Sequence, residues 1–148
     1  GPVCSVILIT GAGGMFGGVL RTSGIGDALE DVLSDLGIPV ILAGFLIAAV
    51  MRVAQGSATV ALTTAAGLIA PAVLAGGYNE VQLAAMVVAV AAGSVVLSHV
   101  NDSGFWLVGR FLEMDVRTTF KTWTVLETII GVVGFTVAAV IFGLAGAF

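Results

Sequence analysis

The sequence predicts an all-α, polytopic membrane protein, and three observations support this fold class. Hydrophobic residues make up 59% of the 148 residues and charged residues 9%, whereas an average soluble domain has roughly 25% charged residues. The mean hydropathy is +1.18. Several stretches without charge are also close to the roughly 20 apolar residues that a membrane-spanning helix needs. These stretches cover residues 1–20, 36–51, 53–79, 81–101 and 128–148.

The first two segments differ in character. Residues 3–20 are apolar and rich in glycine, a composition that permits close helix packing or local unwinding. Residues 21–36 combine four of the nine acidic residues with apolar residues at helical spacing, which predicts a short amphipathic helix at the membrane surface. The chain starts at Gly1 and has no basic region before its apolar segment, so it does not resemble a secretory signal. We expect a fragment of a longer membrane protein.

Residues 38–75 are predicted to form a helical hairpin. Two apolar arms, residues 38–54 and 60–75, flank the polar tip Gln55-Gly56-Ser57-Ala58-Thr59. Each arm would be about 24 Å long, which is shorter than the roughly 30 Å hydrocarbon core of a bilayer. This length favours a re-entrant hairpin with its tip inside the membrane. Two full spans in a thinned bilayer remain the alternative.

A broken helix is predicted next. Residues 76–80 form a turn, and Tyr78 suits a membrane interface. The apolar segment 81–97 is then interrupted by the polar residues of LSHVNDSGFW and resumes over residues 104–114. A charged group in mid-membrane costs roughly 2.5 to 3.5 kcal/mol, and such groups usually mark an ion or substrate path. We expect Asp102 to cap the helix that begins at Ser103 or Gly104 and to present charge to a cavity.

Residues 123–148 are predicted to form the last membrane-spanning helix. The charges that precede this helix indicate how the chain is oriented in the membrane. Three basic residues lie between the last two segments: Arg110, Arg117 and Lys121. The positive-inside rule places this loop in the cytoplasm. The C-terminus, the turn at 76–80 and the acidic segment 21–36 would then lie on the outer side.

The hairpin tip and the helix break together predict an anion site. A helix that begins inside the membrane points unpaired N–H groups and a partial positive charge at the cavity, which suits a carboxylate. The helix beginning near Val60, with Ser57 or Thr59 as its cap, would be a second such end. Two polar breaks that meet near mid-membrane are typical of secondary transporters. Arg52 could balance the charge of a bound anion or pair with Asp102 or another acid, and both roles stay open.

Other classes of function fit the sequence poorly. The segment VILITGAGGMFGG resembles a dinucleotide-binding loop, but Phe16 stands where its third glycine should be. Ser98, His99 and Asp102 are too close in sequence for a converging hydrolase triad, so we expect no enzyme. One His and one nearby carboxylate cannot complete a metal site, and no cofactor is expected. Five basic residues make no nucleic-acid footprint.

Three long motifs resemble the C-terminal region of the gluconate permease family. Members of this family are proton symporters for gluconate and related sugar acids. The motifs are ITGAGGMFGGVLRTSGIG, RVAQGSATVALTTAAGLIAP and SHVNDSGFWLVGRFLEMDVRTTFKTWTVLET. The resemblance implies a multi-pass protein of the bacterial inner membrane, built as one half of an inverted-repeat transporter that moves substrate by an elevator-like motion. Residues 55–59 would then be the tip of the second repeat's hairpin, and residues 98–103 the break in its helix. The N-terminal repeat lies outside residues 1–148.

The expected function is import of gluconate or a related sugar or hydroxy acid by proton symport. Another small hydroxylated acid such as D-serine is the alternative within the family, and a channel-like or non-transporting membrane subunit is the alternative outside it. Sodium in place of the proton, and a homo-oligomer within the lipid bilayer, are left open. The candidate proton carriers are His99 and Asp102; histidine is chosen because the charge of an unperturbed imidazole changes in the physiological pH range. The candidate substrate-binding residues are Gln55, Ser57, Thr59, Ser98, Asn101 and Ser103.

Overall fold

The described residues form an all-helical bundle, as the sequence predicts. The structure is a computed structural model that describes Met15 and residues 37–147, so the predictions for residues 3–20 and 21–36 lie outside the described residues. Within 37–147 every regular element is helical. The elements are α3 (Val40–Gln55), α4 (Ala58–Ala75), α5 (Glu80–Gly93), α6 (Ser103–Phe111), α7 (Val116–Thr119), the π-helix η1 (Phe120–Thr124) and α8 (Val125–Ala145).

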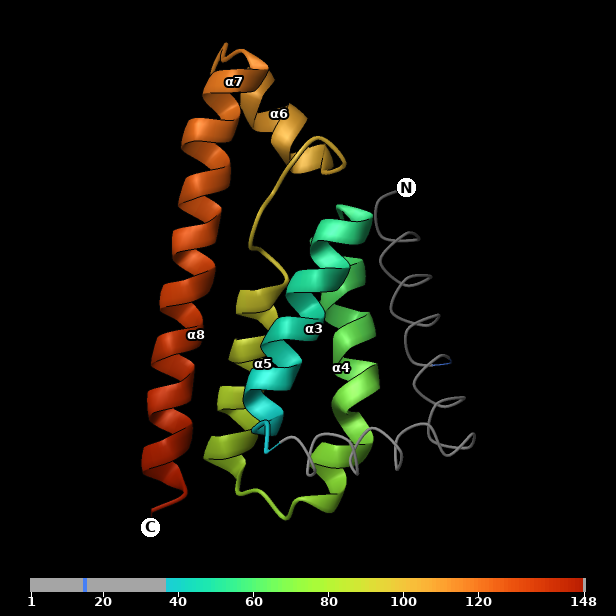
Figure 1. Ribbon diagram of the computed structural model, residues 1–148, viewed down its shortest axis with the longest axis vertical. Coiled ribbons are helices and arrows are strands. Elements are labelled where there is room, and N and C mark those ends of the chain that lie inside the picture. Colours follow the sequence, from blue (N-terminus) through green and yellow to red (C-terminus); the bar gives the residue numbers. More distant parts are fainter. Residues whose placement is uncertain (1–14, 16–36, 148) are drawn as a thin grey trace.

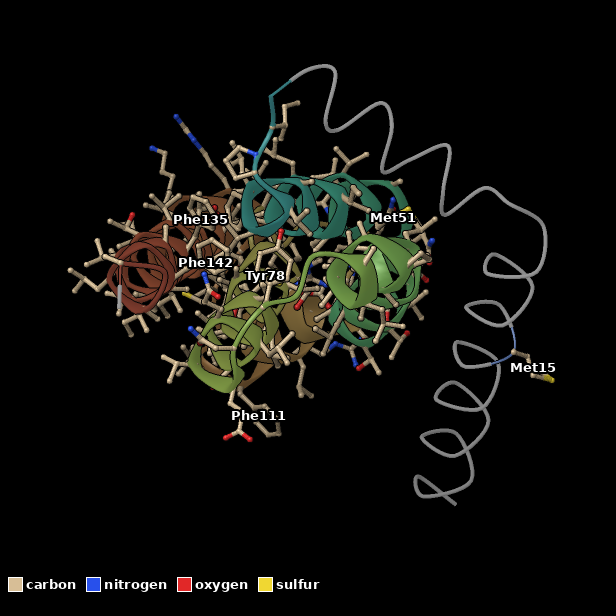
Figure 2. The ribbon with its side chains drawn as sticks, turned by 90° about the horizontal axis from the view of Figure 1, so that it is seen from below. Met15, Met51, Tyr78, Phe111, Phe135 and Phe142 are labelled. Atoms are coloured by element: carbon tan, nitrogen blue, oxygen red, sulfur yellow. The ribbon has the colours of Figure 1, made fainter. Side chains whose placement is uncertain are left out.

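Four of these helices lie roughly side by side (Figure 1). α5 packs against both α8 and α3, and α3 packs in turn against α4. α6 and α7 form a corner at the end of the bundle where α8 begins (Figure 1). In the end-on view, Phe135 and Phe142 of α8 lie near Tyr78, between α8, α3 and α5 (Figure 2), and all three pack against the same hydrophobic core. The ring centroids of Tyr78 and Phe142 are 5.6 Å apart.

The predicted hairpin corresponds to α3 and α4, joined by a very short tip. α3 starts directly after Pro39 and ends where Gly56 takes up a left-handed conformation with φ of 80°. Ser57 then caps α4, its side chain accepting a hydrogen bond from the backbone N–H of Val60. The two helices are separated by Gly56 and Ser57 alone, so the tip is tighter than the five residues expected.

Small residues allow the helices to approach closely. A β-carbon added to Gly93 of α5 would lie 2.3 Å from the carbonyl oxygen of Phe45 in α3. One added to Gly131 of α8 would lie 2.4 Å from Val96 and 2.7 Å from the carbonyl oxygen of Ala92. Such contacts between small residues are typical of helix packing in membranes, where no hydrophobic effect drives the helices together.

The Gly131 contact gives a testable prediction. We expect Gly131→Ala to destabilise the protein by about 1 to 3 kcal/mol, because the new methyl group overpacks the interface between α5 and α8. Gly143→Ala is the matched control, since an added β-carbon there meets nothing within 4 Å. The two variants gain the same helix propensity. Thermal unfolding in detergent measures the difference, and equal melting temperatures would contradict the interface.

The turn at 76–80 and the C-terminus lie at the same end of the bundle, as predicted (Figure 1). The side-chain amide of Asn79 donates a hydrogen bond to the carbonyl oxygen of Ala145 at 2.9 Å. Arg110, Arg117 and Lys121 belong to α6, α7 and η1 at the opposite end. That this basic end faces the cytoplasm stays a prediction.

Two helical stretches are long and apolar enough to cross a membrane. They are Ala58–Ala75, and the continuous stretch Val116–Ala145 that joins α7, η1 and α8. α3 and α5 are apolar but shorter, with 16 and 14 residues. Large apolar side chains such as Ile129, Val133 and Val137 are exposed along α8, as expected for a helix that contacts lipid or another apolar surface. Whether the α3–α4 hairpin is re-entrant stays a prediction.

Candidate functional site

The hairpin tip contacts the helix break directly. A β-carbon on Gly56 would lie 2.3 Å from the carbonyl oxygen of Asn101 and 2.6 Å from its Cβ. Only glycine can therefore occupy position 56, for reasons of both space and backbone conformation. The sequence predicts that the two polar interruptions meet, and this contact confirms it.

Arg52 lies behind this contact and is almost completely buried, with 2% of its surface exposed. Its guanidinium donates to the carbonyl oxygen of Gly56 at the tip. The Nη2 atom also lies 2.5 Å from Oδ2 of Asp102 and 3.6 Å from Oε2 of Glu127. Pairing with an acid, one of the two roles left open for Arg52, is therefore present in the structure.

Asp102 caps α6, as predicted. Its Oδ1 accepts a hydrogen bond from the backbone N–H of Gly104 at 2.9 Å. Its Oδ2 accepts from Arg52 and from the hydroxyl of Ser98. The carboxylate therefore joins the tip, the break and the start of α6.

The break in the helix is longer than predicted. Its backbone is hydrogen-bonded to side chains near the start of α8. α5 ends at Gly93, so the chain leaves the helix before the polar residues begin, and Leu97 has a positive φ of 54°. The backbone N–H of Leu97 donates to the hydroxyl of Thr128, and the carbonyl oxygen of Ser98 accepts from the hydroxyl of Thr124. Non-helical backbone at membrane depth requires such partners.

Aromatic side chains complete the support of the break. The indole Nε1 of Trp123 donates to the hydroxyl oxygen of Ser98 at 3.0 Å, and that of Trp106 donates to the carbonyl oxygen of Val100 at 2.8 Å. Trp123 and Thr124 lie in the π-helical turn η1. π-Helical turns occur frequently at functional sites.

The predicted substrate-binding residues differ in accessibility. Ser98 is fully buried, and its hydroxyl both donates to Asp102 and accepts from Trp123. Ser57 is half-buried at the tip. The exposed members are Gln55, Thr59, Asn101 and Ser103.

His99, the other candidate proton carrier, is half-buried in the break. Its Nδ1 is buried and has no hydrogen-bond partner among the residues that the structure describes.

The two helix N-termini are not equivalent as anion receptors. The start of α6 is already occupied by the carboxylate of Asp102. The start of α4 is capped by the neutral hydroxyl of Ser57, at a long distance of 3.4 Å. Because the first N–H groups of a helix have no intrahelical partner, the α4 end has more capacity for a carboxylate.

Sequence reasoning missed the contacts that the last helical stretch makes with Arg52 and with the break. Residues 123–148 are predicted as a clean span, but Glu127 lies within them and approaches Arg52. Thr124 and Thr128 support the break. Thr124, Glu127 and Thr128 recur at helical spacing, so they share one face of the helix, and this pattern could have identified them.

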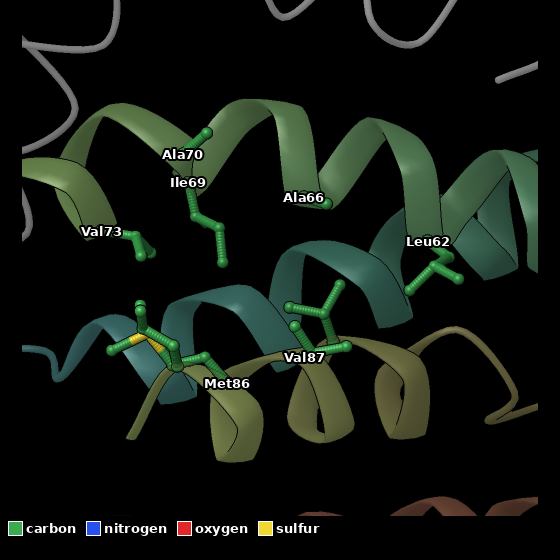
Figure 3. Close-up of a pocket in the computed structure, with 9 residues that line it drawn as sticks. Leu62, Ala66, Ile69, Ala70, Val73, Met86 and Val87 are labelled. Atoms are coloured by element: carbon green, nitrogen blue, oxygen red, sulfur yellow. The ribbon is translucent and has the colours of Figure 1, made fainter. Parts of the chain in front are cut away.

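A cavity of about 210 Å³ lies between α4 and α5, and it differs from the polar contact between tip and break in its chemistry (Figure 3). Its lining is entirely apolar and includes Leu62, Ile69 and Val73 of α4 together with Met86 and Val87 of α5. It offers no polar group to a hydroxylated acid, so it does not fit the expected substrate.

The level of the tip along the bundle follows from its neighbours. The break that the tip contacts is bonded to Thr124 and Thr128, near the start of α8. About 30 Å of helix then separates this level from Ala145. The tip therefore lies nearer to the basic end of the bundle than to the end that carries the C-terminus.

Comparison with known proteins identifies the family of the chain. The family model described as GntP family permease matches residues 1–144. The chain is 46% identical over 143 residues to the low-affinity gluconate transporter of Escherichia coli, covering 97% of the chain and 32% of that protein. It is 48% identical over 134 residues to a gluconate permease of Pseudomonas aeruginosa, covering 90% and 29%. A gluconate permease of Bacillus subtilis is 44% identical over 129 residues, covering 87% and 28%.

No solved structure matches the chain. The chain spans about a third of the length of the curated relatives that it matches. These relatives are named as permeases or transporters and not as enzymes, which confirms the prediction that the chain is no enzyme. The family match over residues 1–144 also confirms the resemblance carried by the three motifs. The chain belongs to the GntP permease family.

Proposed function

We propose that the chain forms part of a secondary transporter of the bacterial inner membrane, which imports gluconate or a related sugar or hydroxy acid by proton symport. The observation that carries the proposal is the contact between the hairpin tip and the helix break around buried Arg52. Two helices start at this contact, α4 and α6. Related chains named gluconate transporter or permease support the choice of substrate.

The substrate carboxylate would bind at the start of α4. The helix dipole and the unpaired N–H groups of the first turn favour a negative charge there. The exposed Gln55, Thr59, Asn101 and Ser103 offer hydrogen bonds to the hydroxyl groups of a sugar acid. Ser98 would act indirectly, by holding the Asp102 carboxylate in place.

The proposal is tested with the full-length permease that contains these residues, reconstituted in proteoliposomes. Labelled gluconate should accumulate against its gradient when the outside is acidic, and much less without a pH gradient. Competition by other hydroxy acids, including D-serine, defines the substrate range. Uptake that neither saturates nor concentrates gluconate would indicate a channel, and accumulation driven by sodium alone would overturn the proton symport.

A change at Ser57 tests the carboxylate position. Ser57→Asp should raise the KM for gluconate about tenfold or more, because a like charge about 4 Å away costs about 1 to 4 kcal/mol. Ser57→Asn is the matched control, since Asn caps a helix as well as Asp but carries no charge. Initial uptake rates over a range of gluconate concentrations measure the effect. An equal KM in both variants would place the carboxylate elsewhere.

A further inference from the structure

The buried cluster around Arg52 contains more acid than base. One guanidinium, with 2% of its surface exposed, lies 2.5 Å from the carboxylate of Asp102 and 3.6 Å from that of Glu127. The exposed fractions of these two acidic side chains are 11% and 17%. With both acids ionised, the cluster has a formal charge of −1, which a buried site disfavours. One bound proton would make the cluster neutral.

The two carboxylates are not equally suited to hold that proton. Asp102 accepts hydrogen bonds from Arg52, Ser98 and the backbone of Gly104, and hydrogen bonds to a carboxylate favour its ionised form. Glu127 has only the longer contact to Arg52 and accepts no hydrogen bond from the residues described between 37 and 147. The negative charge of Asp102 also disfavours a second ionised acid in the same cluster. The proton therefore belongs on Glu127.

Few other charged or titratable groups lie on the helices that pack around Glu127. α3 contributes Arg52, and the break contributes His99 and Asp102. α4 contributes no charged residue, and α5 contributes only Glu80, at the far end of the bundle. Lys121 lies more than one helical turn before Glu127 and is exposed. His99, whose Nδ1 is buried without a partner among the described residues, is thus the competing proton carrier.

We propose that Glu127 is the proton-binding carboxylate of this permease, and that its protonation allows the anionic substrate to bind at the nearby tip. The proposal rests on the proposed function and extends it. With Glu127 ionised, the cluster repels the carboxylate of the substrate. With one proton taken up from the outer side, the cluster is neutral and the anion binds. Release of the same proton to the cytoplasm expels the anion, so one proton moves with each substrate carboxylate.

The test compares Glu127→Gln with the wild-type, full-length permease in proteoliposomes, with gluconate as the substrate. Gln keeps the side-chain volume and leaves the pair of Arg52 and Asp102 intact, so the variant should fold. We expect it to exchange external for internal gluconate without a pH gradient, but to lose accumulation driven by a pH gradient. In the wild type, KM should rise about tenfold per pH unit once Glu127 is ionised, as one linked proton requires. In Glu127→Gln, KM should not depend on pH.

Three further variants complete the experiment. Glu127→Asp keeps a carboxyl group and should keep the coupling. Glu80→Gln removes an exposed acid at the far end of the bundle and should match the wild type. If Glu127→Gln keeps both accumulation and the pH dependence of KM, or if His99→Gln loses them instead, the role of Glu127 is overturned. A wild type that transports no sugar acid overturns the proposed function, and this inference with it.

Discussion

Arg52→Met is expected to destabilise the protein by about 3 to 5 kcal/mol, because it leaves two carboxylates buried without their cation. Arg52 has 2% of its surface exposed and contacts both Asp102 and Glu127. It also bonds the carbonyl oxygen of Gly56, so its loss removes a link between the tip and the break. The melting temperature of the full-length permease in detergent measures the effect.

Two comparisons separate this charge effect from a simple loss of packing. Arg110→Met removes an exposed cation of α6 and should change the melting temperature little. The triple variant Arg52→Met, Asp102→Asn, Glu127→Gln removes all three charges and keeps a capping residue at 102. It should recover most of the lost stability, since a neutral cluster has no uncompensated charge. A triple variant as unstable as Arg52→Met would show that the guanidinium contributes through its packing.

Gly56→Ala is expected to separate the tip from the break. A left-handed conformation costs a non-glycine residue about 1 to 2 kcal/mol, and φ at position 56 is 80°. The new methyl group would also lie 2.3 Å from the carbonyl oxygen of Asn101, and overpacking of this kind costs about 1 to 3 kcal/mol. Protein that still folds should take up gluconate poorly, because the proposed site is formed by this contact.

Gly77→Ala is the matched control for Gly56→Ala. Gly77 has a φ of 64°, but an added β-carbon there meets nothing within 4 Å. Gly77→Ala therefore includes the free-energy cost of a left-handed alanine but not the steric clash. Melting temperatures and uptake rates of the two variants isolate the contact between tip and break. If both variants lose stability equally and transport equally well, the contact has no role in the site.

Much of this arrangement could be predicted from the sequence because polar residues are rare in it. In an apolar chain, a polar stretch has few uses other than a turn, a cap or a site. Asp102 could be assigned as a helix cap for this reason, which is confirmed. Ser57 is one of two candidate caps, with Thr59, and the structure shows Ser57 in that position. The contact between the tip and the break is confirmed as well. The predicted hairpin arms differ from α3 and α4 by at most two residues at any end.

The remaining features depend on contacts between distant parts of the chain. Apart from Gly93 and Ser94, the residues of this segment before Ser98 are apolar, so the sequence gives only a weak local signal that α5 ends at Gly93. The helix stops there because Thr124 and Thr128 supply partners for the freed backbone groups. Glu127 was overlooked for a similar reason. A single acid near the end of an apolar segment usually lies at the membrane–water interface. The sequence does not show that Arg52 lies close to Glu127, because this contact forms only in the folded chain.

The hydrogen bonds between the break and residues 123–128 also have a mechanical consequence. Leu97 and Ser98 are bonded to three side chains of the last helical stretch, namely Trp123, Thr124 and Thr128. Sliding α5 along α8 by one turn would break all of these bonds together. A motion that moved the break relative to the last helical stretch would therefore have to give up three hydrogen bonds at once, whereas a motion of the two together would keep them.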